Sequence, residues 1–596
     1  MTSRLAAAAI SALAAATFGA FFIAQRLKHS PTIVQQVMMT PLFSPNGDGR
    51  HDAAHFSFKL RHHDDVTVAV LDAKGDVVRT LVDNRPLGAD TPISIPWDGR
   101  TGTGLRAPDG RYRVRINLRR QGRSVVSRRS VRLDVTAPHP VVTAVTPNIF
   151  PARGAGSVAV RFRGPAGFPA RFTVYRTDRL PARPVARFEG IARSHVGRWD
   201  ARVDGRKASP GTYLIAVELR DRAGNRGSAP AQLPPRAGEV EGHPGVTVRY
   251  VGGQQLAGPT APGPGDPVLA GRPLTFGIDA RGRPYGWSIR RVGASAPRKR
   301  GVKTSPKLTV HAPGGASGVY LLEARRNGHS TRVPFAVQGS EHANVLLVLP
   351  WLSWQGANPV DTDGDGIPNA LPFGEAAPLA RPFAAGGLPA GFVERTAPLL
   401  VYLDRQGLRY DVATDLQLAG ASGAGLLRGR SGVLLAGDER WLPLSAGRRL
   451  RSYVQGGGKV ASVGIDSLRR QVVLAEGGTR LERPTAPASR DVFGADIGPL
   501  VRRRADLLNF PDDKIGLFAD TGGGFPAYDA YEPTRSVRPG RIVAAAGPET
   551  GRPVIVAVRL GKGLVIRFGL PAFPQYLSTD PNTAALMRRT WTLLSR

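Results

Sequence analysis

The chain contains no cysteine and only four methionines among its 596 residues. Without cysteine it cannot form disulfide bonds, thiolate metal sites or a cysteine nucleophile. Aromatic residues make up 7% of the chain, whereas glycine and proline are abundant, with 72 and 51 residues. This balance favours short strands and turns over a helical bundle. The length exceeds what one hydrophobic core can serve, so several domains are expected.

Histidine is absent from every position after His342. The C-terminal part of the chain therefore cannot contain a Cys–His dyad, a Ser–His–Asp triad or a histidine-ligated metal. Carboxylates, tyrosines and amides are the side chains left there for acid–base or metal chemistry.

Positive charge is in excess and is unevenly distributed. The chain carries 81 Lys and Arg against 46 Asp and Glu, a net charge of +35; residues 1–340 hold 51 against 22, and residues 341–596 hold 30 against 24. An exported basic surface attracts anionic wall polymers, anionic carbohydrate or lipid headgroups. No aromatic stacking platform is interleaved with the basic patches, so nucleic acid is the least favoured partner. The alternative is a solvated basic surface without a partner.

An apolar segment spans residues 5–24, between Arg4 and the pair Arg26 and Lys28. Its length is close to what a bilayer crossing needs. We therefore predict a signal anchor over residues 1–28, which would hold a single-pass protein of the cell membrane with its bulk outside the cytoplasm. A cleaved signal peptide, which would release a secreted protein, and a buried N-terminal helix are the alternatives.

Two successive segments share a layout and are predicted to form β-sandwiches over residues 41–136 and 137–232. Each contains Trp-Asp, a Gly-rich turn, and Gly-x-Tyr at the start of an alternating strand, at Trp97 and Tyr112 in the first and at Trp199 and Tyr213 in the second. Alternation indicates strands with one buried face, and the tryptophans would anchor the cores. A third sandwich is predicted over residues 240–338, where Asn327-Gly328 is a hairpin signal.

The first of these segments resembles the FlgD-type immunoglobulin-like repeats of bacterial surface proteins. The resemblance is carried by FSPNGDG at 43–49, WDGR at 97–100 and the Asp-Gly-x-Tyr step at 109–112. It implies an immunoglobulin-like sandwich that acts as a spacer or a binding platform.

After Gln338 the pattern changes, and residues 341–596 are predicted to form an α/β domain with a mainly parallel, flavodoxin-like sheet. The apolar run at 432–436 is typical of a strand buried on both faces. Asp438 and Glu439 follow at its carboxyl end, where open α/β sheets place their ligands. The two carboxylates are the candidate catalytic acid–base pair. The alternative is a structural role in which they cap the following loop and pair with nearby arginines.

Residues 240–596 resemble the C-terminal region of the N,N-dimethylformamidase beta (large) subunit family, a class I glutamine-amidotransferase-like fold. The resemblance is carried by WLSWQGAN at 351–358, LLAGDERW at 434–441, GGGK at 456–459 and VPFAV at 333–337. It implies amide hydrolysis and an iron held by tyrosines and a glutamate, a place that Glu439 would take. Ala357 stands where the family has a tyrosine. The remaining candidate tyrosines are Tyr402, Tyr410, Tyr453, Tyr528 and Tyr531.

A second acidic motif places Asp361, Asp363, Asp365 and Asn369 at alternate positions around glycines. Calcium favours such a convergence of oxygen ligands. The motif resembles the aspartate-rich loops of thrombospondin type 3-like repeats, and we predict a structural calcium site. It is not a full EF-hand, because Pro372 stands where the bidentate glutamate would be.

Together these features favour an extracytoplasmic, membrane-anchored envelope protein that is not an enzyme and binds an anionic or carbohydrate partner. The alternative is an exported iron-dependent amide hydrolase related to N,N-dimethylformamidase.

Overall fold

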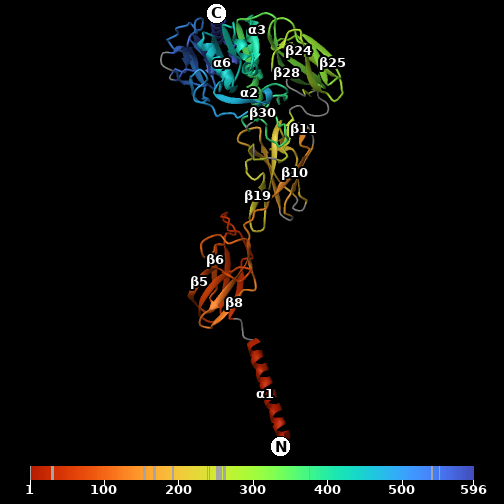
Figure 1. Ribbon diagram of the computed structural model, residues 1–596, viewed down its shortest axis with the longest axis vertical. Helices are drawn as coiled ribbons and strands as arrows, with labels where there is room; N and C mark the ends of the chain where they lie inside the picture. The colour runs from red at the N-terminus through yellow and green to blue at the C-terminus, as the bar shows by residue number, and fades with distance from the viewer. Residues whose placement is uncertain are drawn as a thin grey trace.

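The computed structural model is elongated, with helix α1 (Thr2–Lys28) at one end and the C-terminal domain at the other (Figure 1). The structure describes residues 2–28, 33–151, 156–165, 169–190, 194–237, 239–240, 242–249, 258–259, 263–374, 376–384, 386–537, 541–549 and 551–596. Strands account for 41% of the chain and helices for 15%, so the protein is mostly β.

Helix α1 corrects the prediction of an N-terminal membrane helix. In the described part of the chain, no helix combines the length and the apolar character that a bilayer crossing requires. The physical reason lies in the composition, because ten of the twenty residues from 5 to 24 are alanine. Alanine is the strongest helix former, but its small side chain contributes little apolar surface.

The first sandwich encloses one core between a three-stranded sheet, β1-β3-β6, and a larger sheet, β2-β9-β7-β4-β5, whose strand β7 also pairs with β8. Its centre is Trp97, whose ring lies 4.9 Å from that of Tyr112 and 5.3 Å from that of Phe43. The strands are β1 (Val34–Met39), β2 (Leu42–Phe43), β3 (Ala54–Leu60), β4 (Asp64–Leu71), β5 (Val77–Leu87), β6 (Ile93–Trp97), β7 (Gly110–Leu118), β8 (Arg123–Val126) and β9 (Val131–Leu133).

The second sandwich repeats this arrangement with sheets β10-β12-β15 and β11-β20-β18-β13-β14, and β19 pairs with β18. The two tryptophans play matching roles, because the indole N–H of Trp97 donates to Arg100 and that of Trp199 to Arg202, each over 2.9 Å. The strands are β10 (Val141–Thr146), β11 (Ile149–Pro151), β12 (Val158–Arg163), β13 (Ala170–Arg176), β14 (Arg183–Glu189), β15 (Val196–Trp199), β16 (Arg202–Val203), β17 (Arg206–Lys207), β18 (Gly211–Arg220), β19 (Arg226–Ala229) and β20 (Val246–Arg249).

A buried amide joins the first two sandwiches. Asn225, in the turn after β18, is 3% exposed, and its side-chain oxygen accepts a hydrogen bond from Ser44 over 2.5 Å. Its amide nitrogen donates to the backbone carbonyl of Asp134 over 2.7 Å and to Asp221 over 2.9 Å. The FSPNGDG loop of the first sandwich is therefore one half of the joint to the second.

The third group of strands forms sheets β21-β23-β26 and β22-β28-β27-β24-β25 around a separate core. An ion pair between Arg291 and Asp404 joins it to the C-terminal domain, with Nη2 and Oδ1 2.8 Å apart. The strands are β21 (Gly258–Pro259), β22 (Val268–Leu269), β23 (Pro273–Asp279), β24 (Tyr285–Arg291), β25 (Lys299–Lys303), β26 (Lys307–His311), β27 (Gly318–Arg326) and β28 (His329–Gln338).

The C-terminal domain is built on a nine-stranded mixed sheet with the order β31-β29-β32-β34-β43-β42-β41-β38-β39. The pairings from β31 to β43 are parallel, and those from β43 to β39 are antiparallel. The strands are β29 (Val345–Leu349), β31 (Asp411–Thr414), β32 (Gly432–Leu435), β34 (Lys459–Val463), β38 (Ala505–Asn509), β39 (Gly524–Tyr528), β41 (Ile542–Gly547), β42 (Ile555–Leu560) and β43 (Gly563–Phe568).

The predicted fold class, a C-terminal α/β flavodoxin/amidotransferase-like domain with a mainly parallel sheet, is therefore wrong. The parallel strands are connected through helices, but β42 returns to β43 through a hairpin at Gly561, and β41 pairs antiparallel with β42. Antiparallel strands need only tight turns, whereas each parallel connection needs a crossover. The stretch from 505 to 568 has strands without intervening long helices, so it adds an antiparallel half to the sheet.

Helices cover both faces of the parallel half, and two small sheets, β30-β36-β35-β33 and β37-β40, lie beside it. Alternate residues of β29 enter the two cores, with Leu347 on the side of α3 and α8 and Leu346 on the side of α4, α5 and α6. The helices are α2 (Trp351–Gly356), the π-helical η1 (Phe392–Thr396), α3 (Ala397–Arg405), α4 (Asp415–Ala419), α5 (Gly423–Leu427), α6 (Leu444–Gln455), the 3-10 turn η2 (Glu476–Gly478), α7 (Phe573–Tyr576) and α8 (Pro581–Ser595). The small sheets contain β30 (Ala376–Pro378), β33 (Trp441–Pro443), β35 (Arg470–Ala475), β36 (Arg480–Glu482), β37 (Asp496–Ile497) and β40 (Thr534–Ser536).

Candidate functional site

The carboxyl ends of three neighbouring parallel strands meet at Glu439. Strand β32 leads into the turn that holds Asp438 and Glu439, β31 leads directly into Asp415 at the start of α4, and β29 leads into α2. The backbone N–H of Leu352, in the first turn of α2, donates to both carboxylate oxygens of Asp415 over 2.9 and 3.1 Å. A carboxylate is favoured there, because the first N–H groups of a helix have no partner within it.

Glu439 and Asp415 form a buried pair of carboxyl groups, and each residue is 1% exposed. No N–H or hydroxyl group in the described residues reaches either carboxyl oxygen of Glu439. The group that interacts with it is the carboxyl of Asp415, and two carboxyl groups can share a hydrogen bond only when one of them is protonated. Burial is the largest cause that raises the pKa of Asp415 to about 7, and burial followed by the neighbouring Asp415 raises the pKa of Glu439 well above its ordinary value.

Asp438 belongs to a different set of contacts from its neighbour Glu439. Its carboxylate accepts a hydrogen bond from the backbone of Ile465 over 2.9 Å and forms an ion pair with Arg395. Burial raises its pKa, which the charge of Arg395 opposes. The two residues that the sequence pairs as acid and base therefore do not share a partner. Asp438 fixes a loop and an arginine, and Glu439 faces Asp415.

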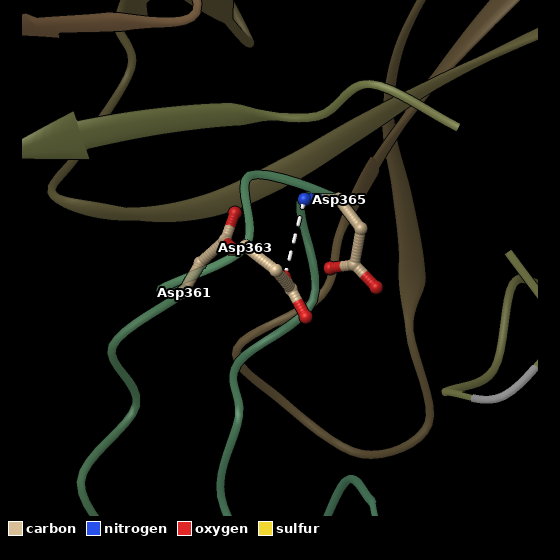
Figure 2. Close-up of side chains that lie close together, drawn as sticks. All are labelled: Asp361, Asp363 and Asp365. Carbon is tan, nitrogen blue, oxygen red and sulfur yellow. Dashed lines mark hydrogen bonds between the residues drawn. The ribbon is translucent and has the colours of Figure 1, made fainter. Parts of the chain in front are cut away.

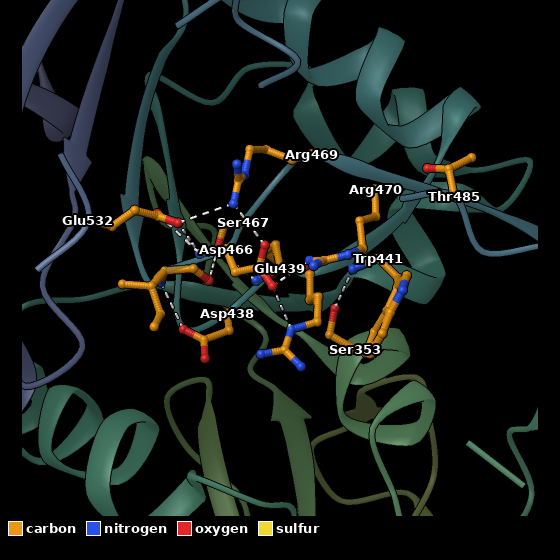
Figure 3. A network of polar contacts seen from close by, with 12 residues as sticks. Ser353, Asp438, Glu439, Trp441, Asp466, Ser467, Arg469, Arg470, Thr485 and Glu532 are labelled. Carbon is orange, nitrogen blue, oxygen red and sulfur yellow. Dashed lines mark hydrogen bonds and ion pairs between the residues drawn. The ribbon is translucent and has the colours of Figure 1, made fainter. Parts of the chain in front are cut away.

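A network of ion pairs surrounds the turn with the sequence GDERW, residues 437–441 (Figure 3). Asp466 contacts Arg440 over 3.1 Å and Arg469 over 3.0 Å, and it also pairs with Arg470. Glu532 accepts from Arg469 over 3.3 Å and pairs with Arg567, and both members of that last pair are buried. These charges hold the loops at the end of the sheet in place, because each one has an opposite partner.

The Trp-Gln-Gly-Ala-Asn segment at 354–358 has a structural use. The buried amide of Gln355 donates to the carbonyl of Arg381 over 3.0 Å and accepts from Asn358 over 3.2 Å. Asn358 in turn donates to the carbonyl of Pro382 over 3.1 Å and accepts from the backbone of Ala384 over 3.1 Å. These residues hold the loop from 381 to 384 against α2.

The described residues do not fit an iron held by tyrosines and Glu439. Four of the five candidate hydroxyls bond elsewhere: Tyr402 to Ala584 over 2.7 Å, Tyr410 to Asp404 over 3.1 Å, Tyr453 to Arg430 over 3.2 Å and Tyr528 with Thr583 over 3.5 Å. The fifth, Tyr531, has a backbone pairing with Val501 and no described contact with Glu439. The partner of Glu439 is a second carboxyl group.

The second acidic motif brings three carboxylates together. Oxygen atoms of Asp361, Asp363 and Asp365 all lie within 4.8 Å of one another (Figure 2). Asp361 accepts from the backbone of Gly364 over 2.6 Å and of Gly366 over 2.8 Å. Burial is the main cause that raises the pKa of Asp361 to about 6 and that of Asp365 to about 7.

Asn369, the fourth predicted ligand, closes this loop from within. Its amide nitrogen donates to Asp363 over 2.8 Å, and its oxygen accepts from the backbone of Thr362 over 2.6 Å and from the hydroxyl of Thr362 over 2.7 Å. The structure therefore groups the three aspartates, with Asn369 bonded to one of them.

The loop of residues 361–369, here called the aspartate loop, lies on the second sandwich. The hydroxyl of Thr177 donates to the carbonyl of Gly366, and the backbone of Gly245 donates to the carbonyl of Gly364 over 2.7 Å. Ile367 packs into a small core with Leu214 and Ala216 of β18. The loop is thus one contact through which the C-terminal domain rests on the second sandwich.

Comparison with known families confirms both resemblances. The chain contains an N,N-dimethylformamidase beta subunit-like C-terminal domain, whose family model matches residues 297–491, and a FlgD Ig-like domain, which matches residues 47–122. The first match includes β25 to β28 of the third sandwich and the GDERW turn. No curated protein matches the chain.

Solved structures similar to the chain are remote. The exo-β-1,4-mannosidase Op5Man5 from Opitutaceae bacterium strain TAV5 is 12% identical, with 43% of this chain and 36% of that chain covered and a TM-score of 0.24. The chain thus spans about a third of the mannosidase. The FN1–FN3 domains of chicken CNTN1 are 10% identical, with 51% of this chain and 98% of that chain covered and a TM-score of 0.17. A bacterial ice-binding adhesin is 11% identical, with 52% of this chain and 97% of that chain covered and a TM-score of 0.23. These values are too low to carry a conclusion.

The sequence alone does not reveal Asp415 as the partner of Glu439. Asp415 lies after a different strand, and only the strand order β31-β29-β32 brings the two together. Its signal is present, because Thr414-Asp415 follows a buried strand and Thr414 caps α4 by accepting from Gln417 over 3.3 Å. Arg567 and Glu532 carry no comparable signal, since their pairing joins a strand of the sheet to a distant loop.

Proposed function

We propose that this protein is an exported, non-catalytic binding protein of the cell envelope. In this proposal the first two sandwiches form a basic stem that binds an anionic polymer or carbohydrate, and the C-terminal domain retains the fold of its family without its activity. The location outside the cytoplasm rests on the N-terminal apolar segment and on the FlgD Ig-like domain.

The observation that carries the proposal is the burial of Glu439 against Asp415. A general base must reach its substrate and must be ionised. Glu439 is 1% exposed, and burial raises its pKa well above the ordinary value, which disfavours the ionised form. A protonated carboxyl group that bonds to a second carboxyl group is suited to holding two loops together, not to attacking an amide.

The competing function is amide hydrolysis, which the family name favours. The two functions differ in iron content and in turnover. We expect the purified protein to contain no stoichiometric iron and to leave formamide and N,N-dimethylformamide unhydrolysed. Hydrolysis that Glu439→Gln abolishes, or stoichiometric iron that this variant loses, would contradict the proposal. Glu341→Gln is the matched control, because Glu341 is an exposed carboxylate at the start of the same domain.

A structural calcium ion at Asp361, Asp363 and Asp365 is a second part of the proposal. Calcium prefers carboxylate oxygens, and an ion there would offset the desolvation and the mutual repulsion that raise the pKa values of Asp361 and Asp365. Its position favours a role in holding the C-terminal domain on the second sandwich, because the same loop bonds to Thr177.

A further inference from the structure

A row of arginines follows the outer face of strand β7 in the first sandwich. Along this strand Tyr112, Val114 and Ile116 are buried in the core, and the alternate positions are Arg111, Arg113 and Arg115. Arg111 and Arg113 are exposed, and Arg115 is partly buried. Same-face residues of a strand are about 7 Å apart, so the row presents a positive charge at that interval.

Within the described residues, these three arginines have no acidic partner. None of them takes part in an ion pair, and the Nε of Arg115 is buried without an acceptor. Arg132 of β9 lies directly opposite Arg111 and pairs with Asp134 over 2.9 Å. Like charges opposite each other destabilise a sheet, and Asp134 balances Arg132 but not Arg111, whose charge a bound anion would balance.

Protection of a sheet edge does not explain the row. Natural proteins place Lys and Arg on edge strands to prevent aggregation, and β25 of the third sandwich, which ends its sheet, fits that use with Lys299, Arg300 and Lys303. Strand β7 is flanked by β9 and β4 within its sheet. Its arginines therefore need another reason.

The second sandwich shows how the equivalent face is used. Tyr213 of β18 corresponds to Tyr112 of β7, since each hydroxyl donates to the backbone carbonyl four residues earlier. The positions that match Arg113 and Arg115 are Leu214 and Ala216, which are fully buried beneath Val240 and Ile367. In the second sandwich this face is thus a docking surface for the aspartate loop.

We propose that the outer face of β7 is also a docking surface, and that its occupant is a linear polymer of phosphate-linked units. The guanidinium fork of arginine matches the phosphate group in a bidentate manner. The neighbours on the outer face of β4, Ala69 and Leu71, lie opposite Arg115 and Arg113 and offer no aromatic platform on which a base could stack. This inference rests on the proposed function and specifies the surface and the charged group of the partner.

The test uses the full-length protein and long-chain inorganic polyphosphate as the probe, with affinity measured at several salt concentrations. The triple variant Arg111→Gln, Arg113→Gln, Arg115→Gln is expected to weaken binding at least tenfold. It should also lower the dependence of log affinity on log salt by about 2, because each lost phosphate contact on a flexible chain removes about 0.7. The matched triple variant Arg298→Gln, Arg300→Gln, Lys303→Gln removes the same charge from the third sandwich and is expected to weaken binding less than threefold.

Equal losses in the two triple variants would overturn the assignment of this surface while leaving the proposed binding function intact. Binding of polygalacturonic acid but not polyphosphate would overturn the phosphate specificity alone. Tighter binding of double-stranded DNA than of polyphosphate would overturn the choice of partner. No binding of any anionic polymer would contradict both this inference and the anionic-polymer part of the proposed function. Arg113→Gln alone, with about a threefold loss expected, replaces the triple variant if that variant does not fold.

Discussion

The two clusters of acidic residues in this protein differ in the hydrogen-bond donors that reach their carboxyl groups. At the end of the sheet, Glu439 faces Asp415 without any described donor, and burial raises the pKa of both carboxyl groups. In the loop on the second sandwich, backbone N–H groups of Gly364 and Gly366 donate to Asp361, and three carboxylates remain close together. The difference teaches that burial and the supply of donors, more than the number of carboxylates, distinguish the two clusters: a proton suits the buried pair, and in our proposal a calcium ion suits the loop.

The largest expected effect is on the free energy of unfolding, and it reflects the deeper burial of the first cluster. Asp415→Ala removes the acceptor of the Leu352 N–H and the partner of Glu439, so it should lower the free energy of unfolding of the C-terminal domain by about 3 kcal/mol. Asp363→Ala, at an exposed position of the loop, should change it by less than about 0.5 kcal/mol without calcium. Urea unfolding followed by tryptophan fluorescence measures both. Similar losses in the two variants would contradict the distinction.

A smaller effect concerns pH. The pKa of Asp415 is raised to about 7 in the folded protein, so between pH 4 and pH 7 the folded state binds more protons than the unfolded state. Stability must therefore fall as the pH rises through this window. We expect the free energy of unfolding of the natural protein to decrease across this window, which urea unfolding at several pH values measures.

Glu439→Gln should reduce this pH dependence by about half, because its amide donates to Asp415 without a titrating proton. Urea unfolding of each variant at several pH values measures this dependence. Asp361→Asn serves as the control, since the pKa of Asp361 is also raised, to about 6. If the two variants flatten the profile equally, the buried pair is not its main source.

The smallest expected effect is that of calcium. Calcium at ten times its dissociation constant should stabilise the junction by about 1.4 kcal/mol at pH 7.5. The gain should disappear at pH 5, where Asp361 and Asp365 are protonated, and in Asp361→Asn at every pH. Thermal unfolding with calcium and with a chelator measures it. A gain that persists in Asp361→Asn would place the ion elsewhere.

Local patterns predicted the parts of this fold that depend on neighbouring residues. The matching Trp and Gly-x-Tyr positions lie in the sandwich cores, and the run at 432–436 contains the buried strand β32. The hairpin at Asn327-Gly328 is present, with positive φ at both residues. Asp438 and Glu439 follow the carboxyl end of β32 in the structure.

Contacts between distant segments could not be predicted in the same way. The pairing of Glu439 with Asp415 depends on β29 lying between β31 and β32, and the antiparallel half of the sheet depends on which edge β43 joins. Hydrophobic periodicity identifies a strand, but it does not identify the neighbour of that strand. The alanine-rich α1 shows a further limit, because segment length alone suggested a membrane crossing.

Asn225 influences the relative orientation of the first two sandwiches. Its buried amide bonds to Ser44, Asp134 and Asp221, which come from both sides of the joint. These hydrogen bonds restrain the rotation of the first sandwich about the second, and the aspartate loop links the second sandwich to the C-terminal domain. A polymer bound along β7 would therefore have a defined orientation relative to the C-terminal domain.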